Sequence, residues 1–370
     1  MYPQITTDCG PAEWRNESTQ KPPKQAVSLH DAGAAAILDQ ARQDTAVIWR
    51  GDFHNAKQVL AALKKRLRAK RPSEKTDLTP AERFHRHRMR QAQQSRTVNM
   101  LAVEIGAGFR LELPRAPDVR AALADVYGEE NDTPFLLPLN QLLGFVGAHE
   151  WHKKGVDIPA LGGRIHVPFG VFSPLRGEYL DLLMRAELPP SFQTAFDIGT
   201  GSGVLAALLV KRGLRRITAT DNNPRALSCA GDNIRSFGLQ RQIGIEAADL
   251  FPEGCADLIV CNPPWLPAKP TSAVETALYD PDHAMLRGFL NGACSHLNGG
   301  GEVWLIMSDL AEHLGLRAAD FLPRCFQTAG LSLIETLHIR PQHGKAVSTD
   351  DPLAFARNQE TTFLYRLKAG

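Results

Sequence analysis

The stretch that decides the fold reads Phe196-Asp197-Ile198-Gly199-Thr200-Gly201-Ser202-Gly203-Val204. Its apolar start, its three alternating glycines and the apolar run that follows predict a buried strand, a tight turn and a helix. Glycine lets the backbone approach a ligand closely, and the following helix directs the positive end of its dipole at the turn. The stretch therefore predicts a turn that holds a cofactor, although a plain strand–helix turn has the same local pattern.

A regular alternation of apolar strands and helices surrounds this turn from Ala195 to the end of the chain. Alternation of this kind predicts a parallel sheet that is covered by helices on both faces. No helix is expected between the last two strands, so these two should pair antiparallel. The pattern predicts a Rossmann-like, seven-stranded α/β sheet. Its strands are expected near 194–198, 216–220, 242–246, 256–261, 302–307, 331–339 and 361–367, and its helices near 203–212, 224–237, 281–297 and 309–328.

A further domain is expected before the sheet, because 370 residues are enough for two hydrophobic cores. Helical and hairpin patterns alternate in residues 1–164, which predicts an α-rich α+β domain there and the sheet domain in 165–370. Residues 1–25 are rich in Pro, Thr, Gln and charge, and we expect a loose tail. Helices are expected at 28–41, 56–70, from 80 onward, at 117–127 and at 138–154, and hairpins at 101–113 and 156–167.

Positive charge is concentrated in one part of this first domain. Thirteen Lys or Arg residues stand against three acids between Lys57 and Arg96, although the formal net charge of the chain is only +2. A helix is expected to begin within this stretch, because Thr79 and Glu82 have the spacing of a capping box. The stretch predicts either an ordinary solvated helix face or a surface for a nucleic acid or another acidic partner.

The six cysteines form no C-x-x-C pair, and several lie in apolar segments. They are expected to be buried free thiols in a reducing cytosol. The first 20 residues lack the apolar core of a signal peptide, and no apolar run approaches the roughly 18 residues of a membrane span. The sequence predicts a cytoplasmic protein without a membrane partner. No metal site is expected: His85 and His87 lie two apart and face different ways on a helix, and His149 and His152 do not have the zincin spacing.

Two acids follow the second and the third strand of the predicted sheet. Asp221, at the tip of the second strand, can accept hydrogen bonds from both hydroxyls of a ribose. Asp249 can accept a hydrogen bond from an adenine amino group, although a turn or helix cap explains this acid equally well. Together with the glycine turn, the acids predict a cofactor that contains a nucleoside. The expected cofactor residues are Asp197, Gly199, Thr200, Gly201, Gly203, Asp221, Asn222, Asp249, Leu250 and Asn262.

The most specific motif follows the fourth strand and reads Asn262-Pro263-Pro264-Trp265. A planar amino group is a poor nucleophile because its lone pair is delocalised. The Asn262 side-chain oxygen and the Pro263 carbonyl can each accept one of its two hydrogens, which fixes the nitrogen and favours positive charge on it. The prolines make the turn rigid, and Trp265 can stack on a flat substrate. These four residues are the predicted catalytic residues; the plain alternative is a proline turn with a core tryptophan.

With these motifs, residues 165–370 resemble a class I methyltransferase that uses S-adenosylmethionine (SAM) and methylates amino groups. The resemblance implies SAM as the cofactor, S-adenosylhomocysteine as the product, no metal, and methyl transfer to a planar amino or amide nitrogen. It also implies that residues 1–164 recognise the substrate. Within the group, the resemblance is greatest to the release-factor glutamine methyltransferases, through Gly170-Val171-Phe172-Ser173-Pro174 and Ala277-Leu278-Tyr279-Asp280.

Three features differ from the glutamine enzymes. Trp265 stands where tyrosine is usual, the N-terminal region is longer and more basic, and Gly301–Met307 is similar to the rRNA guanine enzymes. The substrate therefore stays open between a base of RNA or DNA and a glutamine of a translation-related protein. A binding module without catalysis, directed at nucleic acid or protein, is the alternative of another class. A nicotinamide enzyme is disfavoured because Val204 stands where its fingerprint needs glycine.

Overall fold

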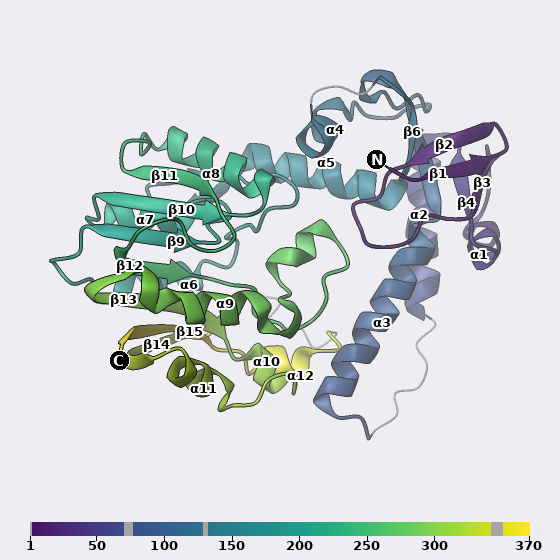
Figure 1. Cartoon of the computed structure of the whole chain (residues 1–370). Coiled ribbons are helices and arrows are strands. Elements are labelled where there is room, and N and C mark those ends of the chain that lie inside the picture. The colour runs from purple at the N-terminus through teal and green to yellow at the C-terminus, as the bar shows by residue number, and fades with distance from the viewer. Residues whose placement is uncertain (1, 70–76, 129–131, 342–350) are drawn as a thin grey trace. The chain divides into compact units, whose positions relative to one another are not determined.

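The computed structural model describes residues 2–69, 77–128, 132–341 and 351–370, and the chain divides into two compact units (Figure 1). Unit 1 consists of Met1–Leu78 and His85–Glu150, and unit 2 consists of Thr79–Phe84 and Trp151–Gly370. Each unit has a hydrophobic core of its own. The functional boundary at 164/165 stays a prediction. None of the helices in the described residues combines the length and the apolar character that crossing a bilayer requires.

Unit 1 is built on a closed six-stranded barrel with the strand order β1-β2-β6-β5-β4-β3. Its strands pair antiparallel between β1 and β2 and between β5 and β6, and parallel elsewhere. Strand β4 is buried along its whole length, as its unbroken apolar sequence favours. The strands are β1 (Gln4–Thr7), β2 (Gly10–Trp14), β3 (Gln25–Leu29), β4 (Thr45–Trp49), β5 (Leu101–Ile105) and β6 (Phe135–Pro138).

The barrel corrects two expectations about this region. Residues 1–25, which were expected to be a loose tail, contribute β1 and β2, and the buried side chains of Ile5 and Trp14 join the core of the unit. The expected hairpin at 101–113 is also wrong. Strand β5 is bound by β4 on one edge and by β6 on the other, so no edge remains for residues 109–113. Closure of the barrel is a long-range arrangement that local alternation does not reveal.

Five α-helices accompany the barrel strands in the described part of residues 2–154. The start of α3 confirms the expected capping box: the Thr79 amide donates to Glu82 Oε2 at 2.8 Å, and the Glu82 amide donates to Thr79 Oγ1 at 3.3 Å. Helix α1 begins later than expected, because residues 25–29 pair as β3. The helices are α1 (Ala34–Arg42), α2 (Phe53–Ala69), α3 (Pro80–Val98), α4 (Arg120–Tyr127) and α5 (Leu139–Lys154).

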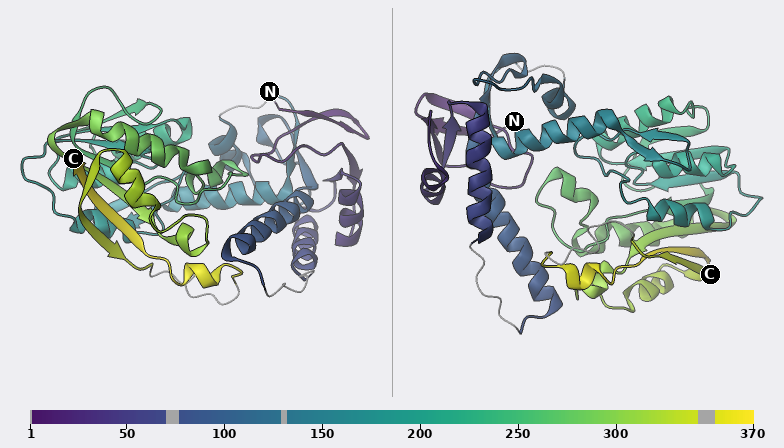
Figure 2. Two further views of the ribbon diagram at one scale, coloured as in Figure 1. Left: turned by 60° about the horizontal axis from the view of Figure 1, so that its bottom comes forward. Right: turned by 180° about the vertical axis from the view of Figure 1, so that it is seen from behind.

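Unit 2 contains a seven-stranded sheet with the order β11-β10-β9-β12-β13-β15-β14. Strand β15 runs antiparallel to both of its neighbours, and the other neighbouring pairs are parallel, which confirms the predicted Rossmann-like sheet (Figure 2). The strands are β9 (Thr194–Ile198), β10 (Arg216–Asp221), β11 (Ile243–Ala247), β12 (Ala256–Cys261), β13 (Leu297–Ser308), β14 (Leu331–Ile339) and β15 (Thr362–Ala369).

Helices cover both faces of this sheet, as the strand sequences require. Along β12, Leu258 and Val260 join the core with α6, α7 and α8, whereas Ile259 and Cys261 join the core with α9 and α11. A short helix, α12, lies between β14 and β15, where none was expected; residues 342–350 of the same loop lie outside the described residues. The helices are α6 (Glu178–Arg185), α7 (Val204–Lys211), α8 (Pro224–Ser236), α9 (Ala284–Ala293), α10 (Leu310–His313), α11 (Phe321–Thr328) and α12 (Ala354–Arg357).

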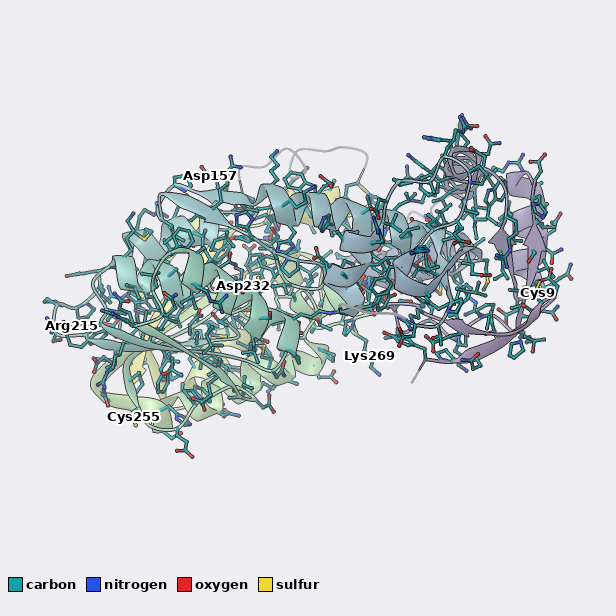
Figure 3. All side chains as sticks on the ribbon, turned by 90° about the horizontal axis from the view of Figure 1, so that it is seen from above. Cys9, Asp157, Arg215, Asp232, Cys255 and Lys269 are labelled. Carbon is teal, nitrogen blue, oxygen red and sulfur yellow. The ribbon has the colours of Figure 1, made fainter. Side chains whose placement is uncertain are left out.

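The expected hairpin at 156–167 is confirmed as β7 (Val156–Ile158) and β8 (Gly163–Ile165). All six cysteines are free. Cys229 and Cys261 are buried, as expected, whereas Cys9 and Cys255 are exposed at the surface (Figure 3). The expectation of buried thiols therefore holds for only part of the set.

A buried ion pair joins the antiparallel strands β13 and β15. The Arg366 guanidinium binds both carboxylate oxygens of Glu302, at 2.9 and 3.0 Å, and the Trp304 indole donates to the same carboxylate at 2.8 Å. Glu302→Ala breaks this buried pair and leaves the guanidinium to Glu335, a half-exposed carboxylate 2.7 Å away. We therefore expect Glu302→Ala to lower the free energy of unfolding by about 3 to 5 kcal/mol in urea titrations.

The matched control is Asp320→Ala, because the Asp320–Arg324 pair is exposed and is expected to contribute less than about 1 kcal/mol. If both variants lost the same free energy of unfolding, burial would not make the Glu302–Arg366 pair more important for stability than an exposed pair.

Candidate functional site

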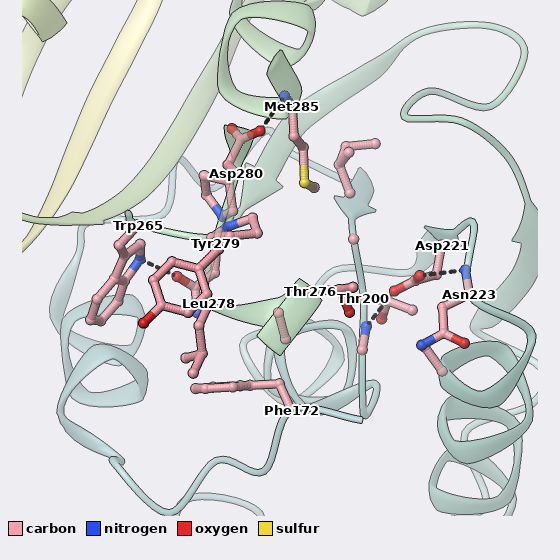
Figure 4. Close-up of a pocket in the computed structure, with 18 of the residues that line it drawn as sticks. Phe172, Thr200, Asp221, Asn223, Trp265, Thr276, Leu278, Tyr279, Asp280 and Met285 are labelled. Carbon is pink, nitrogen blue, oxygen red and sulfur yellow. Dashed lines mark hydrogen bonds between the residues drawn. The ribbon is translucent and has the colours of Figure 1, made fainter. Parts of the chain in front are cut away.

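A pocket of about 860 Å³ lies in unit 2 at the carboxyl ends of β9, β10, β11 and β12 (Figure 4). This edge is where open α/β sheets bind ligands. Figure 4 shows Thr200, Asp221 and Asn223 on one side of it and Phe172 and Trp265 on the other. The pocket brings together most of the residues that the sequence predicts for the site: Gly199, Thr200, Gly201, Asp221, Asn222, Asp249, Leu250, Asn262, Pro263, Pro264 and Trp265.

Asp197 and Gly203 are not among the lining residues and support the glycine turn instead. Asp197 is fully buried, and its Oδ2 accepts hydrogen bonds from the Thr200 hydroxyl at 2.7 Å and the Ala206 amide at 3.1 Å. Gly203 precedes α7 with a φ of 79°, and a Cβ there would lie 3.3 Å from the Cα of Ala230. The two residues thus hold the strand, the turn and the helix in register.

The glycine turn itself has a left-handed backbone at its three glycines. At Gly199 the φ is 71°, and a Cβ would lie 2.8 Å from the methyl carbon of Met285. The Thr200 amide donates to the Thr220 carbonyl at 2.8 Å, which ties the turn to the neighbouring strand. The turn therefore requires glycine for its backbone, as the alternating pattern predicts.

Asp221 is held between this turn and the start of α8. Its Oδ2 accepts from the Gly201 amide at 3.0 Å, and its Oδ1 accepts from the Asn223 amide at 2.9 Å (Figure 4). The Asn223 side chain caps α8 by accepting from the Arg225 amide. A carboxylate has about four lone-pair positions, so Asp221 keeps acceptor capacity for a ligand in the pocket.

Leu250 adopts a left-handed backbone with a φ of 78°, which is unusual for a residue with a branched side chain. Its carbonyl accepts a hydrogen bond from the Thr220 hydroxyl at 2.6 Å. This backbone turns residues 248–250 into the pocket wall, and Asp249 stays exposed there. Backbone strain of this kind, on the order of 1 to 3 kcal/mol, concentrates at functional sites.

Asn262 and Trp265 form a hydrogen bond within the proline motif: the indole Nε1–H donates to Asn262 Oδ1 at 3.0 Å (Figure 4). An indole nitrogen can only donate, so this contact points the amide oxygen of Asn262 at Trp265 and fixes the orientation of the amide. One lone pair of Oδ1 remains for a second donor. Pro263 contributes a carbonyl in the same lining.

Part of the pocket comes from residues that the sequence did not single out as site residues. Phe172 and the segment Ala277–Asp280 line it, and they belong to stretches that carried the family resemblance only. The Leu266 amide donates to the Leu278 carbonyl at 3.2 Å, which holds this segment beside the proline motif. Other lining residues belong to no motif of the sequence: Arg176, Met285, Gly288, Leu310, Arg357 and Glu360.

Asp280 and Glu360 are the buried acids of this wall. Both oxygens of Asp280 accept from backbone amides at the start of α9, those of Met285 at 2.9 Å and Leu286 at 3.0 Å. Glu360 pairs with Arg176 at 3.0 Å and accepts from the Ser308 hydroxyl at 2.9 Å. These acids are engaged within the protein, so they shape the pocket wall.

Burial raises the pKa of Asp197 to about 6; the hydrogen bonds from Thr200 and Ala206 lower this pKa in part, and nearby Asp221 raises it. Since the pKa in the folded state lies above that of the unfolded chain, the free energy of unfolding falls as the pH rises from about 4 to about 6 and stays lower above. The difference in free energy of unfolding between Asp197→Asn and wild type is therefore expected to shift in favour of the variant by roughly 3 kcal/mol from about pH 4 to pH 8. Urea titrations at the two pH values measure it.

The control for this prediction is Asp232→Asn, which makes the same change at an exposed carboxylate of α8. If the stability difference between Asp197→Asn and wild type is the same at both pH values, burial does not perturb the Asp197 carboxyl.

The comparisons with known proteins match the part of the chain that contributes most of the residues lining the pocket. Residues 163–331 match the family described as the methyltransferase small domain, and this region lies within unit 2. Among the solved structures, one match is the ribosomal protein L11 methylase from Lactobacillus delbrueckii subsp. bulgaricus. The match covers 55% of this chain and 84% of that chain, with 19% sequence identity and a TM-score of 0.38.

Two relatives have closer sequences. Release factor glutamine methyltransferase of Cereibacter sphaeroides is 32% identical over 164 residues, which cover 38% of this chain and 59% of that protein. Ribosomal protein uL3 glutamine methyltransferase of Neisseria gonorrhoeae is 40% identical over 129 residues, which cover 34% of this chain and 42% of that protein. The chain spans about half the length of the relatives it matches.

Proposed function

We propose that this chain transfers a methyl group from SAM to the side-chain amide nitrogen of a glutamine in a protein. The premise is that residues 163–331 form a class I SAM-dependent methyltransferase domain, which is related to the release factor and uL3 glutamine methyltransferases. The observation that carries the proposal is one pocket that holds both Asp221 and the Asn262-Pro263-Pro264-Trp265 motif.

The side of the pocket that contains Asp221 fits the cofactor. Asp221 retains lone pairs for the two ribose hydroxyls, because only one hydrogen bond reaches each of its oxygens. A Cβ at Gly199 would meet Met285, and a Cβ at Gly288 would lie 2.9 Å from Leu250, so glycine at both positions keeps this half open. Asp249, exposed in the lining, can accept from the adenine amino group. When bound, SAM supplies an electrophilic methyl group on a positively charged sulfur.

The proline motif fits the acceptor nitrogen. Asn262 Oδ1 has one lone pair left beside the hydrogen bond from Trp265, and the Pro263 carbonyl supplies a second acceptor. Two acceptors hold the two N–H groups of a primary amide, and they favour the positive charge that grows on nitrogen as its C–N bond forms. Fixing the nitrogen in this way also lowers the entropic cost of reaching the transition state. The amide loses its proton after transfer, so a dedicated general base is not required.

Trp265 is proposed to position Asn262. Trp265→Phe keeps an aromatic face and removes the Nε1–H donor, so the Asn262 amide loses its fixed orientation. We expect kcat to fall roughly fivefold to tenfold, as the loss of one neutral hydrogen bond implies, with little change in KM. Steady-state kinetics with saturating SAM measures both. If KM rises while kcat is unchanged, Trp265 acts by stacking on the substrate and not by positioning Asn262.

The relatives support glutamine as the acceptor, because the two compared here are named as glutamine methyltransferases of a release factor and of ribosomal protein uL3. A translation-related protein is therefore the proposed partner. A base of RNA or DNA also presents a planar amino group to the same motif, and it is the competing outcome of the test. A binding module without catalysis is the other competing outcome.

The test combines SAM carrying a labelled methyl group with the purified full chain and a lysate from cells that lack this protein. Label in the protein fraction, assigned to a glutamine side chain by peptide mass spectrometry, is the expected result. Label in RNA or DNA would overturn glutamine as the substrate. Absence of SAM binding in calorimetry would overturn the enzyme itself. Asn262→Ala, tested in parallel, shows whether the label depends on this site.

A further inference from the structure

We propose that the exposed cationic face of α2, which consists of Lys57, Lys64, Lys65 and Arg68, binds the phosphate backbone of a double-stranded nucleic acid. This surface lies in unit 1, and the proposal concerns docking and not methyl transfer. RNA and DNA duplexes present the same phosphate chemistry, so the experiment below compares the two.

The charge of the chain is unevenly distributed along the sequence. Between Lys57 and Arg96 there are 13 Lys or Arg residues and three acids, whereas the rest of the chain has 29 Lys or Arg residues and 37 acids. Helix α2 has no acid among its 17 residues. The acid of α3, Glu82, lies in its first turn, where it is bound to Thr79. A near-neutral protein therefore carries a local, strongly positive segment.

The pattern of burial separates the two sides of α2. Its buried residues are Phe53, Ala56, Leu60 and Leu63, which face the protein. The cations at 57, 64, 65 and 68 follow the helical repeat along another side, where Lys57, Lys65 and Arg68 are exposed and Lys64 is half-buried. The face extends about 16 Å along the helix axis. Duplex DNA carries one charge per about 1.7 Å of axis, so several phosphates fit this length.

The neighbouring helix extends the positive surface. The Gln94 side chain of α3 donates to the Leu67 carbonyl of α2 at 3.1 Å, which places the two helices side by side. Arg86 and Arg90 of α3 are half-buried and four positions apart, on one side of that helix. Arg96 differs, because it pairs with Asp44 at 2.6 Å.

The cations of α2 are crowded, and the described carboxylates do not neutralise them. None of the described carboxylates forms an ion pair with Lys57, Lys64, Lys65 or Arg68. Burial lowers the pKa of Lys64, and the adjacent Arg68 lowers it further. Crowded like charges oppose one another in the free protein, and a polyanion relieves this repulsion. An ordinary solvated helix face carries charges of both signs, as the Arg42–Asp39 pair of α1 illustrates.

The experiment measures binding of the full chain, without SAM, to a short fluorescent RNA duplex and to a DNA duplex of the same sequence. The test variant is Lys57→Ala/Lys65→Ala/Arg68→Ala. The matched control is Arg215→Ala/Arg216→Ala/Arg241→Ala, which removes three exposed cations of unit 2; Figure 3 labels Arg215. All six substitutions replace exposed side chains, and circular dichroism checks that the variants remain folded.

We expect the test variant to bind the duplex at least about tenfold more weakly, and the slope of log affinity against log salt to fall by about 2 to 3. The control variant should bind like wild type. Adding Arg86→Ala and Arg90→Ala should weaken binding further. The duplex that the wild-type chain binds more tightly, RNA or DNA, identifies the natural source of the phosphates.

Three results would overturn the proposal: equal binding by test variant and wild type, an equal loss in the control variant, or a preference of wild type for a polyglutamate peptide or for anionic vesicles over both duplexes. Because SAM is absent, these results leave the proposed methyl transfer untouched. Conversely, a failure to methylate glutamine leaves the duplex-binding result untouched.

Discussion

Asn262→Ala is expected to lower kcat for methyl transfer by at least about 100-fold, the loss typical of removing one group that stabilises transition-state charge. The Asn262 amide oxygen contributes little until positive charge grows on the acceptor nitrogen, so the loss should appear in kcat. SAM should still bind, because Asp221 and the glycine turn are unchanged. Single-turnover kinetics with saturating SAM measures the rate, and calorimetry measures the binding.

Two controls make this result specific. Trp265→Phe, which keeps the Asn262 acceptor, should lose far less activity than Asn262→Ala. Asn262→Asp keeps an acceptor oxygen at the same position and should retain more activity than the alanine variant. Near-normal turnover by Asn262→Ala with the true substrate would show that the proposed mechanism is wrong.

Asp221→Ala is expected to weaken SAM binding by roughly 100-fold. A hydrogen bond to a charged acceptor contributes about 1.5 to 3 kcal/mol, and the carboxylate is proposed to accept from both ribose hydroxyls. The substitution also removes the acceptor of the Gly201 and Asn223 amides, so the turn becomes less ordered. Isothermal titration calorimetry with SAM gives the affinity directly.

The control for this variant is Asp232→Ala on the exposed side of α8, which should bind SAM like wild type. Asp221→Asn keeps one acceptor oxygen and should bind with intermediate affinity. An unchanged affinity for Asp221→Ala would remove the ribose assignment and leave the glycine turn without its proposed ligand.

The sheet of unit 2 was predictable because its determinants are local and repeated. Strand β12 contains the unbroken apolar run Leu258–Cys261, and Gly203 and Pro224 mark the starts of α7 and α8. The barrel of unit 1 was not predictable in the same way. Its strands are short, and β2 pairs with β6 across more than 100 intervening residues. The alternation of apolar residues at 101–113 suggested a hairpin. Both edges of β5 are in fact occupied by β4 and β6, and the local sequence contains no sign of this.

The predictability of the candidate site follows the same division. Gly199 and Asn262 stand directly after a strand, Asp221 is the last residue of one, and parallel strands bring such positions to one edge of the sheet. The opposite wall of the pocket has a different origin. Glu360 reaches the site through contacts with Arg176 and Ser308, which are distant in sequence and have no motif. These contacts depend on tertiary packing, and a single sequence does not encode them in any local pattern.

The placement of Phe84 has a consequence for how this chain is made. Phe84 is buried against Leu310, Leu314, Leu353 and Ala356, so one turn of α3 completes a core whose other residues come from the C-terminal region. Positions 84 and 310 are 226 residues apart. At the usual pace of synthesis, Phe84 waits on the order of 10 to 45 seconds for Leu310, the first of these partners. Unit 1, whose last segment ends at Glu150, can therefore finish first on the ribosome, while unit 2 becomes complete only when the last part of the chain has emerged.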